Sequence, residues 1–166
     1  FDFSGYSDMA IGLAALFGLT IPQNFNSPYK SLSPSDFWRR WHMTLGGWIR
    51  DYLYIPLGGS RRRLPRTIAN LLGTMTIIVF WHGANWTFVL WGTYHGLLLV
   101  LYHLSRKWWD RLPIIFQRSI TLFLIMIGWT IFRSPNLSSL GTMLTAMFRS
   151  AESLKFNQFE TGFLFT

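Results

Sequence analysis

The sequence predicts an all-α fold, a polytopic integral membrane helical bundle with interfacial and re-entrant helices. Three observations support this fold class. Half of the 166 residues are hydrophobic and only 13% are charged, whereas a soluble domain carries about 25% charged residues. Residues 67–105 contain no Lys, Arg, Asp or Glu, and this stretch is long enough for two membrane spans of about 20 residues each. Basic clusters flank the stretch on both sides, as is typical of residues that set membrane topology.

The charge of the chain is the first feature to interpret. The net charge of +8 would suit nucleic-acid binding, but no nucleic-acid recognition module is visible in the sequence. Residues 61–66 and 106–111 are instead basic clusters at the two ends of the uncharged stretch. We therefore predict no nucleic-acid partner and a lipid bilayer as the main partner. Both clusters are expected on the cytoplasmic side, with the turn of the hairpin between them pointing to the opposite side.

The N-terminal part is predicted to be a short apolar helix followed by an irregular connection. Met9 to Leu19 is apolar but too short for a full span, so it fits the end of a helix or a re-entrant helix. Residues 22–28, with two Pro and two Asn, indicate the connection. Asp2 and Asp8 are candidate catalytic acids, although we favour hydrogen bonding or a charge near a helix N-terminus for both.

Ser33 and Pro34 predict the start of the next helix, because Ser is a good capping residue and Pro suits the first helical position. Apolar and aromatic side chains then recur at helical spacing through residues 37–52, with Arg residues on the other side. This pattern predicts a Trp-rich amphipathic helix in the membrane interface, bent or broken at Gly46-Gly47. His42 lies on it, and an interfacial side chain is its simplest interpretation.

The C-terminal part continues the helical pattern. Residues 114–132 form a third apolar segment, and a weaker amphipathic helix is expected after residues 133–135. Residues 151–166 are an unassigned tail. We treat residues 1–166 as a single fragment of one domain, because the chain begins without Met and shows no signal peptide.

The histidines are the candidate functional residues. His82 lies in the uncharged stretch close to the expected turn, and an ionisable group at membrane depth is a functional hypothesis by default; a structural hydrogen bond inside the bundle is the equal alternative. His95 lies in the second half of the same hairpin, and Gly92 and Gly96 permit close helix packing there. The chain has no Cys, and His42, His82 and His95 lack a compact metal-binding spacing, so we predict no metal site.

Five ordered motifs together resemble the membrane-bound O-acyltransferase family, and the resemblance extends to about Phe148. Within that family, the IPLGG run at 55–59 is similar to the branch that takes part in bacterial alginate O-acetylation. The motifs are FDFSGYSDMA (1–10), NFNSPY (24–29), DFWRRWH (36–42), RDYLYIPLGG (50–59) and FWHGA (80–84).

The resemblance implies a function and two site residues. His82 corresponds to the catalytic histidine of the family, and His42 to its second histidine, in the cytoplasmic half of a tunnel through the membrane. The acyl donor is then cytoplasmic, with acetyl-CoA expected and no tightly bound cofactor. A periplasmic acetyltransferase is the implied protein partner, and a bacterial inner membrane the implied location. The family's N-terminal helices are missing from the chain, so we expect this partial fold to be inactive alone.

The chemistry of acyl transfer fits these residues. A neutral His has a pKa suited to taking a proton from a hydroxyl acceptor. Asn85, Trp86, Tyr94 or a backbone N–H are candidates to stabilise the oxyanion. The leading prediction is an O-acyltransferase for extracytoplasmic polysaccharide; the alternatives are D-alanyl or lipid acyl transfer, a non-enzymatic membrane scaffold, or a proton-coupled transporter.

Overall fold

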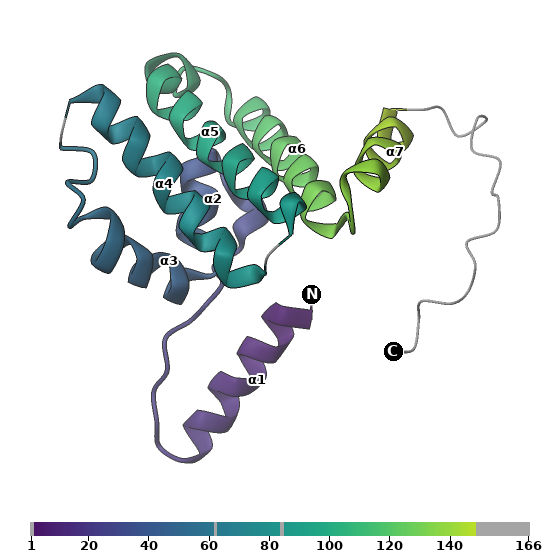
Figure 1. The fold of residues 1–166 in the computed structure, drawn as a ribbon. Coiled ribbons are helices and arrows are strands. Elements are labelled where there is room, and N and C mark those ends of the chain that lie inside the picture. The colour runs from purple at the N-terminus through teal and green to yellow at the C-terminus, as the bar shows by residue number, and fades with distance from the viewer. Residues whose placement is uncertain (1, 62, 84, 149–166) are drawn as a thin grey trace, which may run out of the picture.

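The computed structural model describes residues 2–61, 63–83 and 85–148, with the side chains of Asp2 and of residues 80–82 left out. The described part is helical and contains no strand, which confirms the predicted all-α fold class (Figure 1). Residues 151–166, which the sequence analysis left as an unassigned tail, lie outside the described residues. The helices are α1 (Asp2–Leu16), η1 (Pro28–Lys30), α2 (Pro34–Arg40), α3 (Met43–Ile49), η2 (Arg50–Tyr54), α4 (Leu64–His82), α5 (Trp86–Trp109), α6 (Ile114–Arg133) and α7 (Leu137–Phe148).

Helices α4 and α5 form the hairpin expected from the uncharged stretch. Helix α4 ends at His82, and Gly83 follows it with a φ of 134°, a backbone conformation that favours glycine. The side chain of Asn85 then caps α5 by accepting a hydrogen bond from the Thr87 backbone N–H at 3.2 Å. The predicted turn next to His82 is confirmed.

Glycines on α5 and α6 set how closely these helices pack. A Cβ on Gly92 would collide with Val79 and would lie 2.8 Å from the backbone oxygen of Met75, both on α4. A Cβ on Gly128 of α6 would lie 2.5 Å from Nε2 of His95. Small residues at these places permit close helix packing, as the sequence predicted for Gly92.

Helix α6 packs on α5, and α7 packs on the C-terminal end of α6 (Figure 1). The Ser134 hydroxyl, just after α6, lies 3.3 Å from the sulfur of Met143 in the middle of α7. The predicted third apolar helix and the weaker helix after it are both present. By length and composition, α5 and α6 are each able to cross a membrane, and α4 is a shorter apolar helix.

The segment from α2 to η2 departs from the prediction in where it breaks. Ser33 does cap α2, accepting from the Asp36 backbone N–H at 3.1 Å. A break at Gly46-Gly47 is wrong, because both glycines lie within α3. The break falls at His42, which has a left-handed backbone (φ 47°, ψ 54°).

Backbone pairing with a distant segment explains this break. The backbone N–H of Met43 donates to the Asn24 carbonyl at 2.9 Å, and that of Asn26 donates to the Arg40 carbonyl at 2.9 Å. The connection before η1 therefore forms hydrogen bonds with the Met43 N–H and the Arg40 carbonyl, which would otherwise pair within a continuous helix. These partners lie far away along the chain, so the local residue pattern gave no sign of them.

Helices α2 and α3 pack apolar side chains against the rest of the bundle. The Trp38 ring lies 5.7 Å from that of Trp91, near the start of α5. Phe37 is 3% exposed and Ile49 is 7% exposed, and Ile49 packs in the same core cluster as Val79. Both helices thus bury apolar side chains inside the bundle, and the prediction that this segment lies in the membrane interface stays a prediction.

The same segment then returns toward the start of α4. The buried side chain of Asn70 donates to the carbonyls of Leu57 and Gly59 at 3.1 and 3.2 Å. At the beginning of the segment, the Trp109 indole N–H donates to the Leu32 carbonyl at 2.7 Å. Residues 32–59 thus bend into the bundle and come back, held by hydrogen bonds at both ends.

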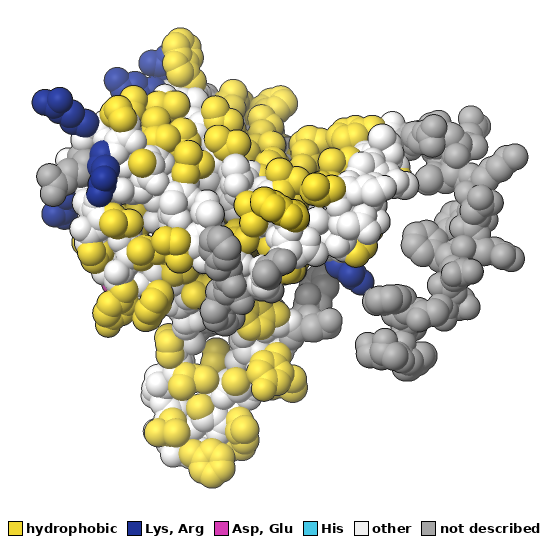
Figure 2. Space-filling model, viewed as in Figure 1, with side chains coloured by type: hydrophobic (Ala, Val, Ile, Leu, Met, Phe, Trp, Pro, Cys, Tyr) yellow, Lys and Arg dark blue, Asp and Glu magenta, His cyan; other side chains and the backbone are white. Residues whose placement is uncertain are grey.

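Helix α1 stands apart from the other helices (Figure 1). Its Phe3 ring lies 5.1 Å from Phe25, in the connection before η1, and 4.9 Å from His42, between α2 and α3. Apolar side chains cover much of the surface in Figure 2, and Lys and Arg gather where α4 begins and α5 ends. The molecule therefore has one basic end and largely apolar sides.

Candidate functional site

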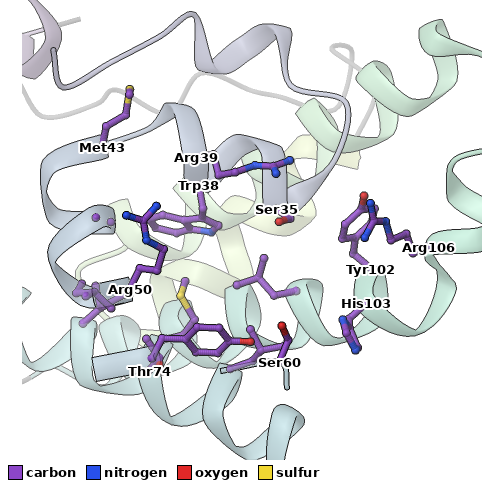
Figure 3. Close-up of a pocket in the computed structure, with 18 residues that line it drawn as sticks. Ser35, Trp38, Arg39, Met43, Arg50, Ser60, Thr74, Tyr102, His103 and Arg106 are labelled. Atoms are coloured by element: carbon purple, nitrogen blue, oxygen red, sulfur yellow. The ribbon is translucent and has the colours of Figure 1, made fainter. Parts of the chain in front are cut away.

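A cavity of about 540 Å³ lies between the α2–η2 segment and the α4–α5 hairpin (Figure 3). One wall comes from the segment that bends into the bundle, and the other from the hairpin. Its lining is Ser35, Trp38, Arg39, Met43, Gly46, Gly47, Ile49, Arg50, Tyr54 and Ser60 on the first wall, and Leu71, Thr74, Met75, Ile78, Leu99, Tyr102, His103 and Arg106 on the second.

The cavity has a basic end and an apolar end. His103 and Arg106 come from the C-terminal part of α5, where the basic residues gather. On α4 the lining continues to Ile78, which lies one helical turn, or about 6 Å along the axis, before His82. The cavity therefore leads from the basic end of the bundle toward the end of α4.

The arginines of the cavity wall are paired with carboxylates. Arg50 lies 2.7 Å from Asp51 and Arg106 lies 3.4 Å from Asp110, measured between side-chain N and O atoms. The hydrogen bond from Arg50 lowers the pKa of Asp51 and raises the pKa of Arg50 itself. Exposed pairs of this kind are weak, so an anionic ligand can replace the carboxylate partner at little cost.

Tyr54 lies on the same wall, at the end of the π-helical turn η2. Burial raises the pKa of its phenol, and a hydrogen bond with Ser60 acts in the opposite direction. The phenol therefore stays neutral near pH 7. Single π-helical turns occur often at functional sites, and this one directs Arg50 and Tyr54 toward the cavity.

His42 begins the helix whose Met43, Gly46 and Gly47 line the cavity. Its Nδ1 lies 3.1 Å from Oδ1 of Asn24. That oxygen also accepts from the hydroxyl and the backbone N–H of Thr44, at 2.9 and 3.3 Å. The His42 ring is therefore held in place by the residues of the 24–26 connection.

These contacts decide which nitrogen of His42 is basic. Because a backbone N–H can only donate, the Asn24 atom that faces Thr44 is the amide oxygen, and the same oxygen must accept from Nδ1 of His42. In the neutral ring the proton then sits on Nδ1, and Nε2 is the basic nitrogen. In the sequence, Asn24 indicated only an irregular connection. Its contact with the His42 ring is formed by the fold.

His82 is the last residue of α4, the helix that supplies one wall of the cavity as far as Ile78. Its side chain lies outside the described residues, so the description of His82 is limited to this backbone position. His42 thus precedes one helix that lines the cavity and His82 ends another, while His42 itself is not among the lining residues. Their catalytic roles stay predictions.

His95 is the most enclosed histidine of the described chain, with 1% of its surface exposed. The rings of Trp38 and Trp91 lie 5.2 and 5.0 Å from its ring, and Gly128 of α6 lies against its Nε2. His95 therefore fills the contact between α2, α5 and α6. Among the residues that the structure describes, no group of three or more His, Asp or Glu side chains is placed to hold a metal ion, and the absence of a metal site stays a prediction.

Two of the candidate oxyanion donors, Asn85 and Tyr94, make hydrogen bonds within the fold. The Asn85 amide accepts from Thr87 and donates to the Pro135 carbonyl at 3.1 Å. The Tyr94 hydroxyl donates to the Leu124 carbonyl at 2.9 Å. Trp86 is 75% exposed. Asn85 and Tyr94 thus hold α5 to its neighbours, and neither lines the cavity.

Comparison with known proteins identifies relatives over most of the chain. The family model of MBOAT, the membrane-bound O-acyltransferase family, matches residues 1–140. A "Probable alginate O-acetylase" of Azotobacter vinelandii is 49% identical over 89% of this chain. A peptidoglycan O-acetyltransferase of Helicobacter pylori is 47% identical over 89% of it, and a teichoic acid D-alanyltransferase of Bacillus subtilis is 32% identical over 80% of it.

These relatives are much longer than this chain. The matched region covers 30% of the Azotobacter protein, 29% of the Helicobacter protein and 37% of the Bacillus protein. The chain thus spans about a third of the length of the curated relatives it matches. The family resemblance expected from the five sequence motifs is confirmed by these matches.

Proposed function

The chain belongs to the membrane-bound O-acyltransferase family, and from this we propose that the whole protein transfers an acyl group, most simply acetyl, to a hydroxyl acceptor. The donor is a cytoplasmic thioester such as acetyl-CoA, and the acyl group moves across the membrane toward a hydroxyl acceptor in extracytoplasmic polysaccharide modification. The relatives named for alginate and peptidoglycan O-acetylation support acetyl as the acyl group and a polysaccharide as the acceptor.

The observation that carries this proposal is the cavity between the two walls. It begins among basic residues, is lined by apolar side chains along α4, and ends one helical turn before His82. A basic entrance suits a phosphate-bearing donor. An apolar interior excludes water and so protects an activated acyl group from hydrolysis.

The two histidines take different parts in the proposed reaction. His82 removes the proton from the acceptor hydroxyl as its oxygen attacks the carbonyl carbon of the thioester. The C–S bond then breaks, and the thiolate leaves with the proton that His82 held. His42, fixed by Asn24 with Nε2 as its basic nitrogen, acts on the donor side by positioning the acyl group.

The location that fits this reaction is a bacterial inner membrane. Helices α4, α5 and α6 cross it, and the segment from α2 to η2 re-enters it from the cytoplasmic face and returns. The apolar sides and the basic end of the bundle support this arrangement (Figure 2). A periplasmic acetyltransferase is the proposed partner that passes the acetyl group on.

The decisive experiment uses the full-length protein in membrane vesicles with labelled acetyl donor. We expect His82→Ala to lower transfer by at least about 10²-fold, the usual contribution of a general base, while the protein stays in the membrane. Near wild-type transfer by this variant would remove His82 from the mechanism.

The same vesicles separate the alternative functions. A D-alanyl thioester donor tests the reaction for which the Bacillus relative is named. Transfer from that donor alone would show that the transferred acyl group is D-alanyl and not acetyl. Proton flux without transfer from either donor would favour a transporter, and neither flux nor transfer would favour a scaffold.

A further inference from the structure

The turn between α5 and α6 exposes large apolar side chains at the basic end of the molecule. Trp108, near the end of α5, is 72% exposed. The first three residues of α6, Ile114, Ile115 and Phe116, are 61%, 71% and 57% exposed. A single exposed apolar side chain is ordinary, but several together indicate a contact surface. This turn is therefore a candidate contact surface.

Hydrogen bonds from two side chains fix the backbone of this turn. The buried side-chain amide of Gln117 donates to the carbonyls of Trp109 and Leu112, at 3.3 and 2.8 Å. The indole N–H of Trp109 donates in turn to the Leu32 carbonyl at 2.7 Å. The exposed apolar side chains therefore stand on a backbone that the fold holds in place, so their exposure is a property of the fold.

Three cations of the same turn have no carboxylate partner. Lys107, Arg111 and Arg118 are exposed, and none of them makes an ion pair with another described residue. The acid between positions 107 and 118 of the sequence is Asp110, and it pairs with Arg106 at 3.4 Å. The three positive charges are therefore available to an anion from outside the described chain.

Trp108 and Arg111 combine apolar and charged surface in one contact. The guanidinium carbon of Arg111 lies 5.2 Å from the centre of the Trp108 ring, which is a cation–π geometry. Trp is typical of the level at which lipid headgroups meet acyl chains, and the planar guanidinium suits phosphate oxygens. Figure 2 shows Lys and Arg side chains beside hydrophobic ones at the top of the view, where α5 turns into α6 in Figure 1. The pair therefore matches the boundary between a phosphate group and an acyl chain.

The spread of apolar side chains around α6 favours lipid over a single neighbouring helix. Successive residues of an α-helix point about 100° apart, so Ile114, Ile115 and Phe116 span about 200° of its circumference. A helix that packs on one protein neighbour needs an apolar stripe only about 100° wide. The buried Gln117 faces the bundle on the remaining side. Acyl chains, which are fluid, can cover all of the outward-facing circumference.

We propose that residues 107–118 bind an anionic phospholipid in the cytoplasmic leaflet. Arg111 and Arg118 attract its phosphate, Trp108 lies at the level of the headgroup, and residues 114–116 insert among the acyl chains. Arg118 is one helical turn beyond Ile114, and its long side chain can reach back from the apolar surface to the headgroup. The net positive charge selects an anionic over a zwitterionic lipid. The leaflet follows from the proposed orientation, whereas the binding itself goes beyond acyl transfer and is independent of it.

The test places a local probe beside this surface in the full-length protein. The exposed Ser119 is changed to Cys in a protein kept free of other cysteines, labelled with a fluorophore and reconstituted into phosphatidylcholine vesicles. Increasing fractions of phosphatidylglycerol or phosphatidylcholine that carry a nitroxide quencher on the acyl chain give the apparent affinity of each lipid. We expect phosphatidylglycerol to bind more tightly. Arg111→Gln combined with Arg118→Gln should lower its affinity about 5-fold for each charge removed.

Two further double variants serve as controls. Arg61→Gln with Arg63→Gln removes the same charge from the other basic cluster, where both residues are also exposed, and should leave the affinity unchanged. Arg111→Lys with Arg118→Lys keeps the charge and should retain the preference for phosphatidylglycerol. Equal affinity of the two lipids for the wild type, or an equal loss in the Arg61 and Arg63 control, would overturn the inference. Quenching by neither lipid would also overturn it, and would show that another part of the full-length protein covers this surface.

Discussion

At the scale of single residues, His42 combines a backbone constraint with a candidate chemical role. Its φ of 47° is in the left-handed region, which costs a residue with a Cβ about 1–2 kcal/mol relative to the right-handed helix. Its ring is fixed by Asn24 and packs on Phe3. A substitution at this position therefore changes backbone strain and side-chain chemistry at once, and an alanine variant alone cannot separate them.

Three substitutions of His42 separate the two effects. His42→Gly and His42→Asn both tolerate the left-handed backbone, whereas His42→Ala does not. We expect the free energy of unfolding of the Ala variant to be about 1 kcal/mol lower than that of the Gly variant. All three should raise the KM for the acyl donor and leave that for the acceptor unchanged, because the side chain is proposed to act on the donor.

The measurements are thermal unfolding in detergent and donor and acceptor titrations of the full-length protein. If His42→Gly kept wild-type kinetics, the imidazole would be a packing group with no part in transfer. A rise in the acceptor KM alone would place His42 on the acceptor side and would reverse the proposed division of labour.

At the scale of elements, the contact between α4 and α5 shapes one wall of the cavity. Gly92 is where the two helices approach most closely, because a Cβ there meets both Val79 and the backbone oxygen of Met75. Val79 is fully buried, so it has little room to move. Separating the helices at this point would shift Met75 and Ile78, which line the cavity.

We expect Gly92→Ala to lower the free energy of unfolding by about 1–3 kcal/mol, the usual cost of an overpacked core. Gly73→Ala is the matched control on α4, since nothing lies within 4 Å of a Cβ added there. Because Ala is the better helix former, that variant should be more stable than the wild type by about 1 kcal/mol at most. Equal stability of the two variants in thermal unfolding would contradict the close approach at Gly92.

At the scale of the whole molecule, the proposed orientation in the membrane rests on the positions of charge and apolar surface. The basic end joins the beginning of α4 to the end of α5, and the opposite end carries the turn between them (Figure 1). If α4, α5 and α6 each cross the membrane, the loops between them alternate sides. The connection before α4 and the one after α5 then face the cytoplasm.

Single-cysteine labelling tests this topology, because the chain has no native Cys. In the full-length protein, kept free of other cysteines, Arg61→Cys and Arg111→Cys should be protected from a membrane-impermeant thiol reagent in intact cells. Ser138→Cys, beyond α6, should be labelled. Labelling of the first two from outside would exclude the proposed orientation, and labelling of all three from one side would exclude α6 as a crossing helix.

The sequence by itself determined the helical hairpin, the third apolar helix and the start of α2. These features depend on composition and on residues close together in the chain: the uncharged stretch 67–105, the apolar segment 114–132, and Ser33 followed by Pro34. Local patterns of this kind carry over into structure because hydrophobic burial and helix capping act within a few residues. The uncharged stretch also singled out His82 as a candidate. The family resemblance assigned it a catalytic role and added His42.

The tertiary structure decided where the α2–α3 segment breaks, how deep it lies, and that a cavity forms beside it. The sequence favoured a bend at Gly46-Gly47, because glycine is the residue that most readily leaves a helix. The break falls at His42 instead, since Asn24 binds its ring and pairs with the backbone of Met43. Such contacts join residues far apart in the chain. They outweigh the preference of the local sequence for a continuous helix through His42 only once the helices have packed together.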